Sequence, residues 1–220
     1  MAPLIETRKV ILFDLDGTIL DNMDPMYTSL KETMAAFGYP ELTEEIHATL
    51  IGMGEKSAMA KLGVQKEKID DIILYRREIY KELANQISIF DGINELMASL
   101  EKAGCTLGIV TGSNQDTVNL TPAARKAVSM VEIVVTADDT TNQKPDPAPI
   151  HCALNRLGTD GSQAVYIGDG PHDIESAHRA GCVSFLAAWN RLDVDLHFTY
   201  QPDYRVNTVG EFRRILLGDN

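Results

Sequence analysis

The sequence lacks the features of disulfide-rich, membrane-spanning and nucleic-acid-binding proteins. Its three cysteines, Cys105, Cys152 and Cys182, are odd in number and widely spaced, with no CxxC pair. This pattern predicts reduced thiols in or near the core. No apolar run approaches the ~18 residues that a membrane-spanning helix needs. Basic residues number 20 against 32 acidic ones, for a net charge of −12, which disfavours a nucleic-acid backbone as partner.

The sequence shows no internal repeat and no low-complexity stretch, and we expect no signal peptide. Glu6 precedes the basic pair Arg8-Lys9, and the apolar run Val10 to Phe13 is too short for a signal-peptide core. We therefore expect a cytoplasmic protein that does not associate with membranes. A length of 220 residues with 44% hydrophobic content fits one large domain, or a core with a small second domain. The oligomeric state is left open between monomer and homodimer.

Short apolar runs alternate with helical patterns through most of the chain, which predicts an α/β fold. Unbroken β-rich runs of this kind indicate strands that are covered on both faces, as in a parallel sheet. The predicted strands are 10–13, 107–110, 133–135, 165–167, 183–186 and 204–206, and the predicted helices between and after them are 92–102, 146–158, 172–180 and 211–216. Asp91 and Asn207 are the expected N-caps of the first and last of these helices. The order of elements predicts a Rossmann-like sandwich around a central parallel sheet.

One region, residues 22–88, breaks this alternation. It shows helical patterns over about 24–38, from Thr43, over 55–62 and over 69–80, and no convincing strand. An insertion of this length between the first two strands is too long for an ordinary crossover. We expect it to form a small all-α helical cap domain over the strand ends. The remaining residues, 1–21 and 89–220, would form the α/β core domain.

Two carboxylates follow the first predicted strand, in Asp14-Leu-Asp16-Gly-Thr. In open α/β sheets, sites form at the carboxyl ends of the strands. Asp14 can attack phosphorus and become an acyl phosphate. Asp16 can give a proton to the leaving oxygen and then activate water. An ordinary turn is the alternative, because Asp-Gly pairs are common in turns.

Polar residues also follow the second and third strands of the predicted core. Thr111-Gly112-Ser113 offers a hydroxyl and backbone amides that suit a phosphate oxygen, although the same composition is common in loops. Lys144 precedes Pro145, which favours an extended backbone at the lysine. Lys144 can neutralise charge on a phosphoryl group and on Asp14, and a solvated surface lysine is the alternative.

The fourth strand runs into Gly168-Asp169-Gly-Pro-His172-Asp173. Asp169 and Asp173 flank the start of a helix and can reach a common point. Magnesium prefers hard oxygen ligands in octahedral geometry. Asp14, the backbone carbonyl of Asp16 and Asp169 would form a fitting set, whereas helix capping is the alternative role of the last two aspartates. We expect His172 to lie beside the site or in solvent rather than on the metal.

Together these four strand ends resemble the motifs of the haloacid dehalogenase (HAD) superfamily of hydrolases, in its phosphoglycolate-phosphatase-like branch. The resemblance spans Val10 to about Leu217, and the four motifs occur in the order of the family. The resemblance implies Mg2+ as cofactor and a helical cap. It implies that Asp14 is the nucleophile and Asp16 the general acid/base, that Thr111 and the Gly112 and Ser113 amides bind phosphate, and that Lys144 bridges Asp14 and phosphate. It also implies that Asp169 is a metal ligand and Asp173 a second one, direct or through water.

Two segments depart from the pattern of the family, and a third, in the expected cap, bears on substrate specificity. Pro122 stands in the path of a helix that is regular in the family, so we expect that helix to bend or restart. The stretch from Trp189 to Pro202 is irregular, and we expect neither departure to touch the four motifs. In relatives, the cap turn that corresponds to residues 52–56 often carries a basic residue that contacts substrate. Lys56 is therefore the candidate for substrate specificity, with an exposed lysine at a helix start as the alternative.

The sequence favours a magnesium-dependent phosphatase that hydrolyses a small phosphorylated metabolite, with phosphoglycolate as one candidate, through an aspartyl-phosphate on Asp14. One alternative is a phosphonate hydrolase similar to phosphonoacetaldehyde hydrolase, with a Schiff base on Lys56. Another is a sugar-phosphate mutase of the same superfamily. A haloalkanoate dehalogenase is disfavoured, because those enzymes lack the carboxylate corresponding to Asp16. A receiver-like phospho-acceptor domain is the non-enzyme alternative, which the long insertion disfavours.

Overall fold

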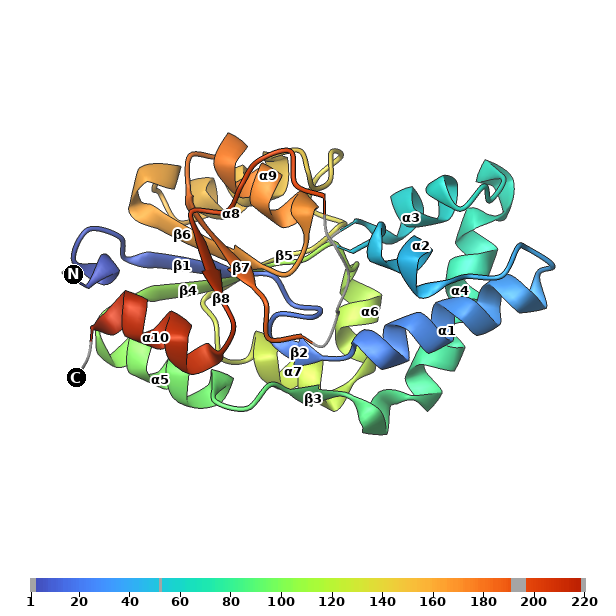
Figure 1. The fold of residues 1–220 in the computed structure, drawn as a ribbon, viewed down its shortest axis with the longest axis horizontal. Helices are drawn as coiled ribbons and strands as arrows, with labels where there is room; N and C mark the ends of the chain where they lie inside the picture. Colours follow the sequence, from blue (N-terminus) through green and yellow to red (C-terminus); the bar gives the residue numbers. More distant parts are fainter. Residues whose placement is uncertain (1–2, 52, 191–196, 219–220) are drawn as a thin grey trace.

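A six-stranded parallel sheet forms the centre of the larger lobe of the molecule (Figure 1). The computed structural model describes residues 3–51, 53–190 and 197–218. The strands lie in the order β5-β4-β1-β6-β7-β8, and every neighbouring pair is parallel. Their bounds are β1 Val10–Phe13, β4 Thr106–Val110, β5 Ile133–Val135, β6 Ala164–Gly168, β7 Val183–Ala187 and β8 Tyr204–Val206. Each predicted strand is present, to within one residue at either end.

Helices cover both faces of this sheet because alternate residues of its strands point to opposite sides. Ile11 and Phe13 of β1 belong to one buried cluster, and Val10 and Leu12 to another. The first cluster includes residues of α5 (Ile93–Lys102), α7 (Pro122–Val128) and α10 (Val209–Leu217). The second includes residues of α8 (Ala148–Arg156) and α9 (Pro171–Arg179). The predicted sandwich is confirmed.

Helix starts follow local capping chemistry and differ in detail from the sequence prediction. α6 (Gln115–Leu120) stops before Pro122, and α7 restarts there with the Thr121 side chain accepting a hydrogen bond from the Ala124 amide. This confirms the expected restart, since proline fits the first position of a helix. The predicted N-caps of α5 and α10 were each wrong by one residue. Gly92 precedes α5 with φ 85°, and Thr208 caps α10 through the Glu211 amide.

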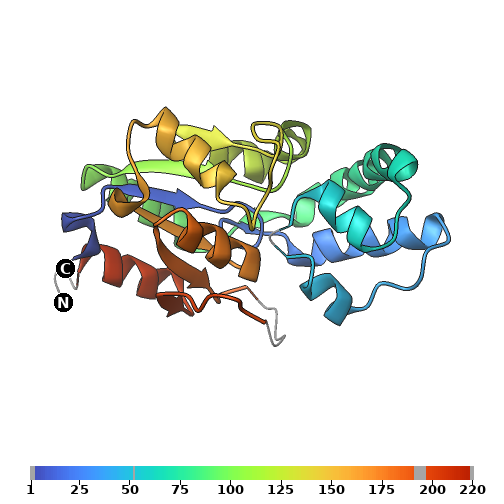
Figure 2. The same ribbon diagram turned by 90° about the horizontal axis from the view of Figure 1, so that it is seen from above.

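The smaller, helical lobe lies beyond one end of the sheet (Figure 2). It contains α1 (Met23–Ala36), α2 (Glu44–Ala48), α3 (Glu55–Lys61) and α4 (Ile69–Glu82). An apolar cluster of its own holds these helices together, with Leu30, Met34, Met59 and Ile72 among its members. Short 3-10 turns occur here at η2 (Lys66–Lys68) and η3 (Ala84–Gln86), and in the larger lobe at η1 (Leu4–Glu6) and η4 (Gly161–Gln163). Among the described residues, no helix is both long enough and apolar enough to cross a bilayer.

A short antiparallel ribbon joins the two lobes. Its strands, β2 (Leu20–Asp21) and β3 (Ser88–Ile89), pair Leu20 with Ile89 and Asp21 with Ser88. This ribbon was not predicted from the sequence, because two residues cannot display a strand periodicity. The ribbon lies where the chain enters and leaves the helical lobe. The loops after β1, β4 and β6 therefore open toward that lobe.

Candidate active site

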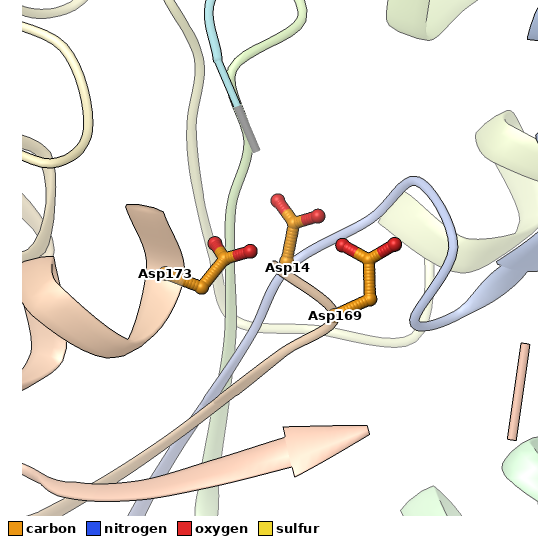
Figure 3. A group of neighbouring side chains, drawn as sticks. All are labelled: Asp14, Asp169 and Asp173. Atoms are coloured by element: carbon orange, nitrogen blue, oxygen red, sulfur yellow. The ribbon is translucent and has the colours of Figure 1, made fainter. Parts of the chain in front are cut away.

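Three aspartates meet at the carboxyl end of the sheet (Figure 3). Asp14 follows β1, Asp169 follows β6, and Asp173 lies in the first turn of α9. β1 and β6 are neighbours, and the Asp14 amide donates to the Ile167 carbonyl at 2.8 Å. One carboxylate oxygen from each aspartate lies within 4.8 Å of the others, and all three residues are buried. Strand pairing thus unites carboxylates that are more than 150 residues apart in the sequence.

Lys144 is buried between two of these carboxylates. Its Nζ lies 2.7 Å from Asp14 Oδ1 and 2.6 Å from Asp173 Oδ1, and its side chain is 1% exposed. The surface-lysine alternative is therefore wrong. The hydroxyl of Tyr166 lies 3.0 Å from both Lys144 Nζ and Asp173 Oδ1. Tyr166 was not predicted as a site residue, although a tyrosine inside a buried strand needs a partner for its hydroxyl.

Excess negative charge sets the electrostatics of this cluster. Burial raises the pKa of Asp14 to about 7, against the attraction of Lys144 and with help from Asp173 and Asp16. Burial, followed by the charges of Asp173 and Asp14, raises the pKa of Asp169 well above its ordinary value. For Lys144, burial lowers the pKa, but the carboxylates of Asp14 and Asp173 together outweigh it and the net shift is upward. The cluster therefore favours uptake of a further positive charge.

A divalent cation fits this donor set. Asp169 Oδ1 is buried and has no hydrogen-bond partner in the described part of the chain. A buried carboxylate oxygen without a partner is costly unless a cation or a proton meets it. Hard oxygen ligands are the ones that Mg2+ selects. Gly17 adds a close approach, because it has φ 72° and a Cβ there would collide with the Asp169 carboxylate.

We expect Mg2+ to stabilise the fold more at about pH 8 than at about pH 5.5. The folded-state pKa of Asp14, about 7, exceeds its usual 3.8. The stability from its protonation is therefore present at low pH and lost as pH rises through about 7. At high pH Mg2+ replaces the proton, and a rise in melting temperature of roughly 5–10 °C fits Mg2+ at ~100 times its Kd.

Differential scanning fluorimetry at the two pH values, with and without MgCl2, measures this dependence. NaCl of equal ionic strength is the control for screening. An Asp169→Asn variant should lose most of the shift. Equal shifts at both pH values would contradict the assignment of this cluster as a cation site.

Asp16 faces the cavity above the acidic cluster and is held by two donors. Its Oδ2 accepts from Ser113 Oγ at 2.8 Å, and its Oδ1 accepts from Asn22 Nδ2 at 2.6 Å. Asn22 also lies 2.8 Å from the Tyr80 hydroxyl, and its Oδ1 accepts from the Gly17 amide at 3.1 Å. Asn22, which is fully buried at the base of the helical lobe, was not predicted as a site residue. These bonds fix the carboxylate of Asp16 in one orientation.

The loop after β4 takes part in the same site. Thr111 is buried, and its Oγ1 accepts a hydrogen bond from the Ser113 amide at 3.0 Å. Gly112 and Ser113 line the cavity. A Cβ on Gly112 would lie 3.2 Å from the Met53 carbonyl oxygen, so the loop approaches the helical lobe closely. The Ser113 amide is thus already used within the loop, whereas its hydroxyl orients Asp16.

A cavity separates the aspartates from the helical lobe. Its empty space, including open solvent at its mouth, is about 820 Å3. Asp14, Asp16 and Asp169 line one side of it. The lobe contributes an apolar wall, formed by Met23, Met26, Leu30, Leu50, Ile51, Met53 and Ala58. It also contributes a group of polar and charged residues, His47, Glu55, Arg76, Arg77 and Tyr80.

The structure does not bring Lys56 to this cavity. Its Nζ pairs with Asp70 at 2.8 Å, and its side chain is 73% exposed. The expectation that Lys56 contacts substrate is therefore not met by its position, which matches the exposed-lysine alternative. Neighbouring Glu55 lines the cavity instead. Successive residues of a helix point about 100° apart, so an assignment off by one residue selects a different face.

The segment after β7 corrects a second expectation. Trp189 Nε1 donates to the Thr18 carbonyl at 3.1 Å. Asn190 Nδ2 donates to Asp169 Oδ2 at 2.8 Å and approaches the Gly17 carbonyl at 3.4 Å. The expectation that this stretch avoids the motifs was thus wrong for its first two residues. Residues 191–196 of the stretch lie outside the described part of the chain.

His172 lies beside the site, as expected. Its Nδ1 is 2.9 Å from the Ile51 carbonyl oxygen, so it links the start of α9 to the helical lobe. Burial lowers the pKa of His172, although its bond to Ile51 opposes the shift. A neutral ring at this junction contacts the lobe rather than the aspartates.

The fold and the site together define an α/β protein with an acidic, lysine-bridged cluster beneath a helical lobe. The model of the family described as haloacid dehalogenase-like hydrolase matches residues 11–187. The pyrophosphatase PpaX of Bacillus velezensis is 32% identical over 206 residues, covering 93% of this chain and 94% of the relative. A phosphoglycolate phosphatase of Xanthomonas campestris is 30% identical, covering 90% of this chain and 91% of the relative.

A solved structure shows the same fold. It comes from Lactobacillus plantarum, is provisionally described as a phosphoglycolate phosphatase, and superposes with a TM-score of 0.80 at 23% identity. The superposition covers 95% of this chain and 99% of the other. The chain therefore belongs to the haloacid dehalogenase-like hydrolases. This membership sets aside the receiver-domain alternative.

Proposed function

We propose that the protein is a magnesium-dependent phosphatase that hydrolyses a small phosphorylated metabolite through an aspartyl-phosphate on Asp14. One observation carries the proposal. Lys144 bridges Asp14 and Asp173 at 2.7 and 2.6 Å, and Asp14 lines the cavity beside Asp169, whose Oδ1 has no hydrogen-bond partner among the described residues. This arrangement combines a positioned nucleophile with groups that neutralise phosphoryl charge.

In the first step, Asp14 attacks phosphorus. Lys144 holds Asp14 Oδ1, whereas Oδ2 accepts no hydrogen bond from the described residues and remains for attack. A new bond forms between phosphorus and the Asp14 carboxylate, and the bond from phosphorus to the leaving oxygen breaks. Asp16 gives its proton to that oxygen, so that the product leaves as a neutral alcohol. When bound, Mg2+ would neutralise charge on the phosphoryl oxygens and on the carboxylates.

In the second step, water attacks phosphorus and restores Asp14. Asp16, now ionised, takes a proton from the water, and the phosphorus–Asp14 bond breaks to release phosphate. Ser113 and Asn22 keep the Asp16 carboxylate oriented through both steps. Such positioning is a large part of phosphoryl-transfer catalysis.

We further propose that residues 22–88 act as a cap domain that shields the reacting groups from bulk water. Glu55 of α3 accepts hydrogen bonds from Asn114 and Thr117 on the core, each at 3.3 Å. His172 of α9 contacts the Ile51 carbonyl oxygen of the lobe. These bonds close the lobe over the cavity in this structure. Closure of this kind strengthens electrostatic interactions inside a site.

Asp16→Asn should affect substrates according to their leaving group. On an alkyl phosphate, kcat should fall by about 10^2–10^4, because the alkoxide needs a proton. On p-nitrophenyl phosphate the phenolate leaves unaided, so the first step should survive as a burst and the second step should become slow. Rapid-mixing absorbance measurements detect the burst. Asp203→Asn, which makes the same chemical change beside Ser184 on β7, is the control. Equal losses on both substrates, without a burst, would refute Asp16 as the general acid.

The substrate class rests on the chemistry of the site and on its relatives. Curated relatives with names of a pyrophosphatase and a phosphoglycolate phosphatase support a small phosphorylated compound. We propose a phosphate monoester, with phosphoglycolate as the first compound to test and pyrophosphate beside it. A panel of phosphorylated metabolites, assayed by phosphate release, tests this proposal. Release from none of them would overturn it.

The phosphonate-hydrolase alternative places a Schiff base on Lys56, whose amine must then reach the substrate. Lys56 Nζ instead pairs with Asp70 outside the cavity. Borohydride trapping with a phosphonoacetaldehyde-like substrate tests that alternative, and we expect no adduct. A cytoplasmic location and a monomeric or homodimeric state remain predictions.

A further inference from the structure

Two adjacent arginines of α4 line the side of the cavity that the helical lobe forms. The side chains of Arg76 and Arg77 are 10% and 13% exposed. Arginine is rarely buried unless it is paired. Neither residue takes part in the phosphoryl chemistry described above. Their burial in the wall of the cavity therefore needs a separate explanation.

Most donors of the Arg76 guanidinium group are unused. A guanidinium group carries five N–H donors. Arg76 Nη1 lies 3.2 Å from Glu55 Oε1, and this is its one hydrogen bond within the described residues. Its Nε is buried and has no partner there. Buried donors without acceptors are costly, so a ligand acceptor would be stabilised beside Arg76.

Arg77 is more fully paired than Arg76. Its Nη2 lies 3.4 Å from Glu55 Oε2, and its Nη1 lies 3.5 Å from Asp116 Oδ2. The Asp116 side chain is 83% exposed, so this second pair contributes little. Arg77 thus links the lobe to α6, although its Nε, like that of Arg76, is buried and has no partner within the described residues. Arg76 makes fewer polar contacts and is therefore the better candidate to bind a ligand.

Glu55 offsets one of the two positive charges and holds both groups in place. Its two carboxylate oxygens accept from Arg76, Arg77, Asn114 and Thr117 at 3.2–3.4 Å. His47 also lines the cavity, and burial together with the charge of Arg76 lowers its pKa to about 4. His47 is therefore neutral near pH 7. One positive charge remains uncompensated within this group.

We propose that Arg76 binds a second anionic group of the substrate, a carboxylate or a phosphate, while the phosphoryl group to be transferred lies at Asp14. Glu55 acts as the positioning residue that orients Arg76. The inference rests on the proposed function and narrows its substrate class to small phosphorylated metabolites with a second negative group. A methionine- and leucine-rich wall beside Arg76 strengthens the attraction, because it excludes water.

Arg76→Gln tests this assignment with matched substrates. On phosphoglycolate, which carries a carboxylate, kcat/KM should fall roughly 100-fold, mainly through KM, because a buried charged contact is lost. On ethyl phosphate, which is similar in size but has no carboxylate, the fall should stay below about 3-fold. Pyrophosphate, as a third substrate, tests whether the second anionic group that Arg76 binds can be a phosphate. Lys81→Gln removes an exposed cation from the same helix and should change none of the three.

A second variant separates substrate binding from folding. Arg76→Gln leaves Glu55 paired with Arg77, and Arg76→Lys keeps the positive charge at this position. Both variants should keep a melting temperature near that of the wild type, and Arg76→Lys should keep more of the selectivity for the anionic substrates. Equal falls on ethyl phosphate and on both dianionic substrates would overturn the inference, as would unchanged kinetics.

A binding measurement distinguishes failure of the Arg76 assignment from failure of the proposed function. In the Asp14→Asn background, Arg76→Gln should weaken calorimetric binding of phosphoglycolate by a similar factor. Retained turnover in Asp14→Asn would overturn the proposed function, whatever the selectivity. If Asp14→Asn loses turnover, but Asp14→Asn and Asp14→Asn/Arg76→Gln bind phosphoglycolate equally well, only the anion subsite would be overturned.

Discussion

Replacing Asp14 with asparagine is expected to lower kcat by at least about 10^4 on every substrate, because a covalent nucleophile and its partners act as a unit. The amide keeps the shape of the side chain but cannot form the acyl phosphate. Lys144 would retain its 2.6 Å contact with Asp173, so the positive charge stays paired. Phosphate release under saturating substrate and Mg2+ measures the effect.

The fold should tolerate this change. Burial and the neighbouring carboxylates raise the pKa of Asp14 to about 7, so its ionised form is disfavoured in the metal-free protein. A neutral amide relieves that repulsion, and the melting temperature near neutral pH should stay the same or rise. Asp203→Asn makes the same substitution away from the site and should keep full activity. Activity near the wild-type level in Asp14→Asn would refute the assigned nucleophile.

Removal of divalent cations by EDTA is expected to reduce turnover to background, and added Mg2+ should restore it. Without a cation, the buried oxygen Oδ1 of Asp169 has no partner within the described chain, and the pKa of Asp14 stays near 7. Phosphoryl oxygens entering the site would then meet uncompensated carboxylates. Steady phosphate release, before and after chelation, measures the loss.

The recovery can be assigned to this cluster with one variant. Asp169→Asn keeps the hydrogen-bonding shape but loses the charge, and Mg2+ should restore little of its activity. Its fold can be checked by the melting temperature in EDTA, which should match or exceed that of the wild type. Turnover that resists EDTA in the wild type would contradict the proposed cation site.

The sequence predicted the sheet well because most of its strands are short, mainly apolar runs. Val10 to Phe13 and the other five runs have no competing helical pattern. The helix starts were less certain, since Asp91-Gly92 and Asn207-Thr208 each offer two capping residues in a row. Local chemistry alone does not choose between them. The ribbon β2–β3 depends on pairing between residues about 70 apart, and no local signal marks it.

The phosphoryl side of the site was predictable for a related reason. Asp14, Lys144, Asp169 and Asp173 follow strands, and a parallel sheet brings successive strand ends to one edge. The contacts from outside the motifs were not predictable in this way. Asn22 and Asn190 reach the aspartates from a lobe junction and a loop, and their positions depend on tertiary packing.

The residues that the helical lobe contributes to the cavity were harder still to predict from the sequence. Arg76 and Arg77 lie within a helix whose charged residues suggest a solvated face. Their burial depends on how α4 packs against α1, α3 and the core. Lys56 was selected from a cap turn by its charge, but the structure directs Glu55 into the cavity. Side-chain direction in this turn follows from tertiary structure and not from residue type.

Acid-quench mass spectrometry during turnover tests the central claim most directly. Asp16→Asn with p-nitrophenyl phosphate and Mg2+ should accumulate the covalent species, since its first step outpaces its second. We predict one phosphoryl group on the peptide that contains Asp14, and none when Asp14→Asn is combined with it. A phosphoryl group on another residue, or none during a clear burst, would contradict the account.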